Sequence, residues 1–130
     1  MLSTPTLHPF LSHFPTALLV AGLLMLAFGK RRNNDRLTQA AALNLSLGLL
    51  AAVLAVLSGM FATDLGMWPT VDIEGHQGYS FALILLYVIC TVYAYTNPFS
   101  KTAVMFYAAG LGLMAVTVWS GYLLVFQSAR

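Results

Sequence analysis

The stretch LTQAAALNLSLGLLAAVLAVLSGMFA, residues 37–62, carries no charged side chain and decides the class of this protein. The hydrocarbon core of a bilayer is about 30 Å thick, and a helix needs roughly 20 mostly apolar residues to cross it. Three more stretches of this kind lie at residues 10–29, 76–96 and 102–126. The sequence therefore predicts an all-α integral membrane protein with four transmembrane helices.

The composition agrees with that prediction. Of the 130 residues, 59% are hydrophobic and only 8% are charged, whereas about a quarter of a typical soluble domain is charged. Because the four spans use most of the chain, residues 1–130 are expected to form one domain, an up-down-up-down four-helix bundle. No Lys or Arg precedes the first span, so it is not expected to be a cleavable signal peptide.

The charged residues outside the spans predict how the bundle is oriented. Basic residues follow the first and third spans, whereas residues 63–75 contain acids and no base; the basic residues are Lys30, Arg31, Arg32, Arg36 and Lys101. Loops rich in Lys and Arg stay in the cytoplasm. Both termini are therefore expected to be extracytoplasmic, which means periplasmic for a multi-pass protein of a bacterial inner membrane.

Several classes of function are disfavoured by what the sequence lacks. Cys90 is the one cysteine, so an internal disulfide and a cysteine-ligated metal centre are not expected. No basic stripe alternates with aromatic residues, and a nucleic-acid partner is therefore not expected. No Ser-His-Asp set, Cys-His set or phosphate-binding loop is present, so the chain is not expected to be an enzyme on its own.

Small residues recur every four positions in residues 37–62, and they predict close helix packing. Asn44 and Ser46 in the same stretch are predicted to form hydrogen bonds between helices. Two rows of small or polar residues carry this pattern: Ala51, Ala55 and Gly59, and beside them Ala40, Asn44, Gly48 and Ala52.

Two histidines suggest a cofactor site near the outer face of the bundle. His13 and His76 lie near the outer ends of the first and third spans, which are diagonal partners in an up-down bundle. Their imidazoles could reach toward one iron between them, and Gly59 and Gly121 at a similar height would leave room for a flat macrocycle. We therefore predict one b-type haem. Its expected role is electron transfer with a quinone or a periplasmic redox protein, within a larger complex or a homo-oligomer.

Two alternatives remain open at this stage. His8, His13, Asp64 and His76 could instead form a site for a single Zn, Cu or Fe ion, with Asp72 or Glu74 as a further candidate ligand. His8 and His13 are five residues apart, so on a straight helix they point in different directions. Alternatively, the histidines could serve only to join the outer ends of the helices through hydrogen bonds.

The sequence also resembles a known family. The segment HPFLSHFPTAL at residues 8–18, SGMFATD at 58–64, the histidine that opens the third span and GYLLVF at 121–126 are similar to those of a family of small four-helix bacterial membrane proteins. That family is catalogued as domain of unknown function twenty-two thirty-one. Its most specific motif is matched by His8, Pro9, His13, Phe14 and Pro15. Some relatives are fused to a Rieske-type iron–sulfur domain, which implies membrane redox chemistry.

Overall fold

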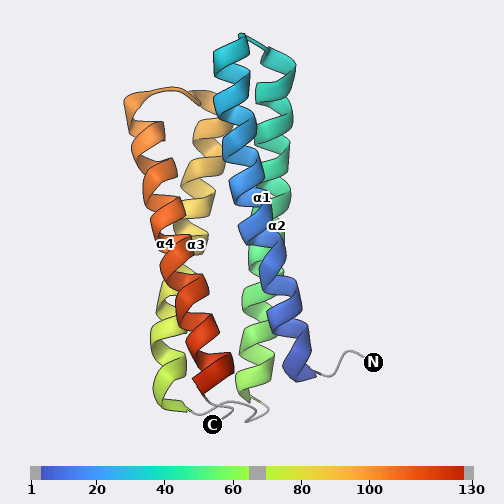
Figure 1. Cartoon of the computed structure of the whole chain (residues 1–130), viewed down its shortest axis with the longest axis vertical. Helices are drawn as coiled ribbons and strands as arrows, with labels where there is room; N and C mark the ends of the chain where they lie inside the picture. Colours follow the sequence, from blue (N-terminus) through green and yellow to red (C-terminus); the bar gives the residue numbers. More distant parts are fainter. Residues whose placement is uncertain (1–3, 65–69, 128–130) are drawn as a thin grey trace.

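The computed structural model contains four long helices and confirms the all-α, up-down bundle (Figure 1). It describes the backbone of residues 4–64 and 70–127 and the side chains of residues 7–62 and 74–126. Neighbours in the sequence are neighbours in space, because α1 packs on α2, α2 on α3 and α3 on α4. The helices are α1 (Thr4–Arg32), α2 (Asp35–Asp64), α3 (Thr70–Thr96) and α4 (Lys101–Gln127).

All four helices are long and apolar enough to cross a membrane. The segments that meet this criterion are Leu7–Arg32, Asp35–Ala62, Glu74–Thr96 and Lys101–Phe126. Large apolar side chains such as Leu85, Met105 and Phe61 are exposed on the outside of the bundle. This arrangement suits contact with lipid rather than with water, and the chain is a multi-pass membrane protein.

The helices extend beyond the predicted spans at their outer ends. α1 begins at Thr4 rather than near residue 10, and α3 begins at Thr70, so part of the loop expected at residues 63–75 is helical. Trp68 and Pro69, between α2 and α3, lie outside the described residues. A helix satisfies its own backbone hydrogen bonds, which favours continuing it wherever the surroundings are apolar.

The two tight turns at the other end of the bundle follow from local chemistry. Asn33 ends α1 with a φ of 50°, a left-handed conformation that Asn tolerates better than most residues. Asn34 then caps α2, since its side-chain oxygen accepts a hydrogen bond from the Leu37 N–H at 3.1 Å. Ser100 caps α4 in the same way, with its hydroxyl oxygen 3.1 Å from the Ala103 nitrogen. Both residue types are preferred at this position.

Small residues bring α1 and α2 close together, and a Cβ on Gly48, a member of one predicted row, would lie 3.0 Å from Leu18 of α1. Gly22 of α1 is packed so tightly that an added Cβ would lie 2.8 Å from Leu45 of α2. The core beside this contact mixes small and large side chains. Its most buried members include Leu19, Ala41, Ala42, Leu45, Tyr87, Cys90 and Ala103.

Polar side chains tie the helices together inside this apolar core. The Tyr87 hydroxyl of α3 donates to the Pro15 carbonyl of α1 at 3.0 Å, across the diagonal of the bundle. Asn44 of α2 donates to the Leu18 carbonyl of α1 at 2.6 Å. The Ser46 hydroxyl lies 3.0 Å from the hydroxyl of Tyr95 on α3. The predicted interhelical roles of Asn44 and Ser46 are confirmed.

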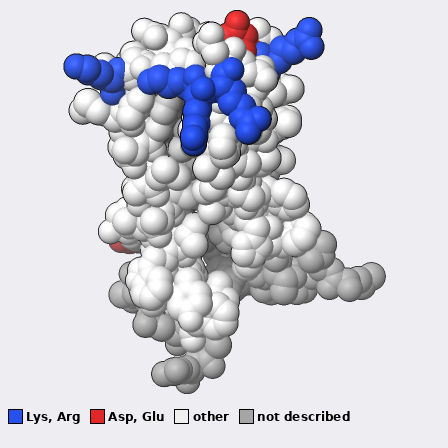
Figure 2. All heavy atoms as spheres, turned by 45° about the horizontal axis from the view of Figure 1, so that its top comes forward, with Lys and Arg blue, Asp and Glu red and all other residues white. Residues whose placement is uncertain are grey.

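The basic residues gather at the end of the bundle that holds the two tight turns (Figure 2). Lys30, Arg31, Arg32, Arg36 and Lys101 are all exposed there, and the Lys30 ammonium lies 5.6 Å from the centre of the Phe99 ring. α1 begins and α4 ends at the opposite end (Figure 1). Which of these ends faces the cytoplasm stays a prediction.

Candidate functional site

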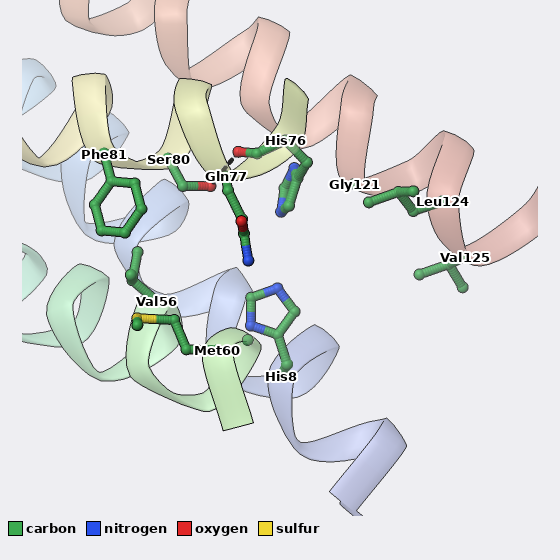
Figure 3. Close-up of a pocket in the computed structure, with 11 residues that line it drawn as sticks. His8, Val56, Met60, His76, Gln77, Ser80, Phe81, Gly121, Leu124 and Val125 are labelled. Atoms are coloured by element: carbon green, nitrogen blue, oxygen red, sulfur yellow. Dashed lines mark hydrogen bonds between the residues drawn. The ribbon is translucent and has the colours of Figure 1, made fainter. Parts of the chain in front are cut away.

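Two histidines from diagonal helices meet near the end of the bundle where α1 begins. His8 of α1 and His76 of α3 have ring centroids 6.0 Å apart and ring planes at 80°. Both side chains are half-buried. Each ring turns one nitrogen toward the other ring across a small gap (Figure 3).

His8 is held by the neighbouring helix α2. Its Nδ1 lies 2.7 Å from the Ala55 carbonyl oxygen and 3.1 Å from the Ser58 hydroxyl oxygen. The Ser58 hydroxyl itself donates to the Ala55 carbonyl at 2.7 Å. The ring is therefore fixed through Nδ1, and Nε2 is the nitrogen left for other partners.

His76 is held in a similar way by α4. Its Nδ1 lies 2.7 Å from the Ser120 hydroxyl oxygen, and that hydroxyl donates to the Thr117 carbonyl at 2.8 Å. Each histidine is therefore bonded to a serine of the helix that follows it in the chain, and each serine donates to the carbonyl three residues earlier in its own helix.

A glycine lies against each imidazole. A Cβ on Gly59 would be 2.9 Å from the Cε1 atom of His8, and a Cβ on Gly121 would be 3.1 Å from the Cε1 atom of His76. Both distances are shorter than ordinary van der Waals contacts between carbon atoms. A side chain on Gly59 would force the His8 ring to shift, and one on Gly121 would force the His76 ring to move by a few tenths of an ångström.

The two rings border a cavity of about 60 Å³ between the α1–α2 and α3–α4 hairpins. Apart from the histidines, its lining is mostly apolar, with Gln77 and Ser80 as polar side chains. The Ser80 hydroxyl is already bonded to the His76 carbonyl of its own helix at 2.8 Å. Among the described side chains, no carboxylate, lysine or arginine lines the cavity, so the imidazole nitrogens are the strongest potential ligands there. Other lining residues include Val56, Met60, Phe81, Leu124 and Val125 (Figure 3).

The residues predicted for the site separate into three groups. His76, Gly59 and Gly121 line the cavity together with His8. His13, predicted to face His76, is exposed on the surface of α1 and does not line the cavity. Asp64 ends α2, but its side chain lies outside the described residues. The structure thus places His8, and not His13, opposite His76.

The predicted set of four metal ligands is not assembled by the described side chains. Among residues 7–62 and 74–126, no group of three or more His, Cys, Asp or Glu side chains is close enough to hold a metal ion. Cys90 is buried far along α3, where its thiol donates to the Phe106 carbonyl at 3.4 Å. The site therefore offers two nitrogen ligands from the described side chains and no third.

Four apolar helices long enough to cross a membrane define a multi-pass membrane protein, and two facing histidines border a cavity between its hairpins. The chain belongs to the family described as predicted membrane protein (DUF2231), whose model matches residues 4–129. The resemblance carried by the motif at residues 8–15 is thereby confirmed. No curated protein and no solved structure matches the chain significantly.

Proposed function

We propose that this chain binds one b-type haem between His8 and His76 and transfers single electrons as a membrane subunit. The observation that carries the proposal is the pair of imidazoles that face each other while both Nδ1 atoms are hydrogen-bonded elsewhere. Imidazole nitrogens bind metals at about 2.0–2.1 Å, so two rings on opposite sides of one metal have centroids roughly 6 Å apart. The observed spacing of 6.0 Å agrees with this value.

The number of ligands favours haem over a bare zinc ion. A structural zinc site normally uses four protein ligands, and a catalytic one uses three. His8 and His76 supply two, and the described residues offer no third. A haem brings four nitrogen ligands of its own and needs only the two axial ones. When bound, it would supply one-electron chemistry.

The glycines and the apolar lining also support a flat hydrophobic cofactor. Gly59 and Gly121 present no side chain beside the rings, and Val56, Leu124 and Val125 offer an apolar surface. A cavity of about 60 Å³ is smaller than a macrocycle, so binding would require the helices on the α1–α4 side to separate while the two imidazoles keep their spacing. α1 and α4 make few contacts with each other, which makes separation on that side the least costly.

The orientation of the bundle indicates where electrons would be exchanged. The exposed basic residues at the turn end favour a cytoplasmic location for that end. The histidine pair would then lie near the periplasmic face of a bacterial inner membrane, with both termini periplasmic. A quinone or a periplasmic redox protein is the proposed electron partner, and the chain would work as a subunit of a larger complex or a homo-oligomer.

The test is an absorption spectrum of the protein purified from haem-replete cells. We expect a reduced-minus-oxidised spectrum of a low-spin b-type haem, lost in His8→Ala and in His76→Ala. His13→Ala is the matched control, because it removes an exposed histidine of α1 that does not line the cavity. A colourless protein would refute the proposal, as would a spectrum that depends on His13 and not on His8.

A second candidate is a single copper(I) ion held by the same two nitrogens. The small cavity favours it, because a bare ion fits without separation of the hairpins, and copper(I) accepts two opposed imidazole ligands. Metal analysis of the same preparation separates the two candidates. One copper per chain, lost in His8→Ala and kept in His13→Ala, would support the ion, whereas iron in proportion to haem would support the cofactor.

A further inference from the structure

The same arrangement of side chains holds both imidazoles. In each hairpin, a histidine on the first helix meets a Ser-Gly dipeptide on the second: His8 meets Ser58 and Gly59, and His76 meets Ser120 and Gly121. In each hairpin the serine hydroxyl also donates to the carbonyl three residues earlier in its own helix. The two halves of the site are therefore built alike, although they come from different parts of the chain.

The hydrogen bonds around His8 determine which of its nitrogens carries the proton. A carbonyl oxygen can only accept, so the contact between Nδ1 and the Ala55 carbonyl at 2.7 Å requires a proton on Nδ1. A neutral imidazole has one N–H, and Nε2 is then left with a lone pair. This lone pair lies on the part of the ring that faces the cavity (Figure 3).

The same conclusion follows for His76 by one more step. The Ser120 hydroxyl has one proton, and it is donated to the Thr117 carbonyl at 2.8 Å. The hydroxyl oxygen can therefore only accept from the His76 Nδ1, which lies 2.7 Å away. His76 is thus also protonated on Nδ1 and presents the lone pair of Nε2.

We infer that the dipeptides Ser58-Gly59 and Ser120-Gly121 are two copies of one imidazole holder. In each copy the hydroxyl and the carbonyl fix the proton on Nδ1, and the glycine lets the ring lie close to the helix, so that Nε2 is free to bind a metal. Ligand histidines usually donate their second N–H to such a partner, which sets the tautomer and the ring orientation. That the Nε2 lone pairs bind a metal rests on the proposed function. The tautomers of the two rings do not, because they follow from the hydrogen bonds alone.

The two holders are not equally dependent on their serines. The Ala55 carbonyl accepts from His8 at 2.7 Å, closer than Ser58 at 3.1 Å, so His8 should keep its tautomer without the Ser58 hydroxyl. For His76, the Ser120 hydroxyl at 2.7 Å is the acceptor that meets hydrogen-bond geometry. Ser120 is therefore the positioning residue whose removal matters most.

The test uses the cofactor-free protein with ¹⁵N-labelled histidine in detergent, and it reads the tautomer of each ring from its nitrogen chemical shifts. The pH is set about two units above the ordinary histidine pKa of about 6.5, so that the rings are neutral. We expect His8 and His76 to be protonated on Nδ1. In Ser120→Ala, His76 should lose this single form, and Ser120→Thr should restore it. In Ser58→Ala, His8 should keep it.

Matched variants test the glycines and control for general disturbance. Gly121→Ala should displace the His76 ring and change its shifts, whereas Gly112→Ala on the same helix should not, because a Cβ there meets nothing within 4 Å. Ser12→Ala removes a hydroxyl that donates to the Pro9 carbonyl of its own helix and should leave both rings unchanged.

The outcomes also separate this inference from the proposed function. A proton on Nε2 of either ring would overturn the holder, even in a protein that binds haem. An unchanged His76 in Ser120→Ala would show that the Thr117 carbonyl suffices, and it would overturn the role of Ser120. Rings protonated on Nδ1 in a protein that binds neither haem nor copper would refute the proposed function while leaving the holder intact.

Discussion

The contact between Gly48 and Tyr87 predicts a strong coupling between two substitutions in the core. Tyr87 is 1% exposed, and its hydroxyl joins α3 to α1 through the Pro15 carbonyl. Those are the helices that bear His76 and His8. A Cβ on Gly48 would collide with the Tyr87 hydroxyl and lie 2.9 Å from the Cζ atom of that ring and 3.0 Å from Leu18. Gly48 therefore leaves the space that the Tyr87 side chain occupies.

The magnitudes follow from these contacts. Gly48→Ala should cost about 1–3 kcal/mol of unfolding free energy through overpacking, offset by roughly 0.5–1 kcal/mol because alanine favours a helix more than glycine does. Tyr87→Phe removes one hydrogen bond, which is worth about 0.6 kcal/mol on average in a membrane protein and at most about 1.7. In the double variant the colliding hydroxyl is gone, so the loss should be smaller than the sum by at least about 0.5 kcal/mol.

The assay is reversible unfolding in detergent of the unmodified protein, the two single variants and the double variant. Unfolding is monitored by circular dichroism in a denaturing detergent titration. Gly112→Ala is the matched control, since its Cβ would meet nothing within 4 Å and only the helix-propensity gain should remain. Strictly additive costs for Gly48→Ala and Tyr87→Phe would refute the reasoning. An equal effect of Gly48→Ala and Gly112→Ala would do so too.

Four further expectations test other parts of the structure. Asn44→Ala should lower the unfolding free energy by about 0.6–1.7 kcal/mol, because it removes the bond to the Leu18 carbonyl; a detergent titration measures this loss. Asn34→Ala should cost about 0.5–2 kcal/mol by removing the cap of α2, and Asn34→Asp should recover most of it in the same measurement. A reporter active only in the cytoplasm should be active when inserted between Asn33 and Asn34 and inactive after Arg130, and the reverse pattern would contradict the orientation. If haem binds with the ring planes still at 80°, the ferric protein should give an electron paramagnetic resonance spectrum dominated by one line at high g, rather than three resolved lines.

The fold could be predicted from the sequence because the bilayer leaves few solutions. A charge-free stretch such as residues 37–62 must be a helix, since no other conformation of a single segment satisfies all of its backbone hydrogen bonds in lipid. The basic residues between the first two spans lie, as expected, in or beside the turn where α1 ends at Arg32 and α2 begins at Asp35. The helices α1 and α3 begin before the predicted spans at residues 10 and 76, because a helix that crosses a membrane can continue past the apolar stretch that marks the span in the sequence.

The histidine opposite His76 was harder to predict, because depth along a helix does not give direction around it. The buried residues Pro15, Leu19 and Leu26 mark the inward face of α1. His8 is seven residues before Pro15 and returns to within about 20° of the same direction. His13 is two residues before Pro15, about 200° away around the helix. Extending the inward stripe backwards would have selected His8.

The holders of the imidazoles were visible in the sequence only as a repeated dipeptide. Ser-Gly occurs at residues 58–59 and again at 120–121, each on the helix that follows a histidine-bearing one. Gly59 and Gly121 were identified as open space, but the serines beside them were not. Many serines in helices bond to a carbonyl of their own helix, so Ser58 and Ser120 indicate a role in holding a histidine only once the structure shows an imidazole packed against each hydroxyl.

The uneven packing of the bundle also suggests a route into the cavity. α2 and α3 pack against each other along the bundle, whereas α1 and α4 meet at few points. The two hairpins are thus joined mainly through the interface between α2 and α3. In a bilayer the open edge between α1 and α4 faces lipid tails, so a flat apolar molecule dissolved in the membrane could enter sideways without passing through water.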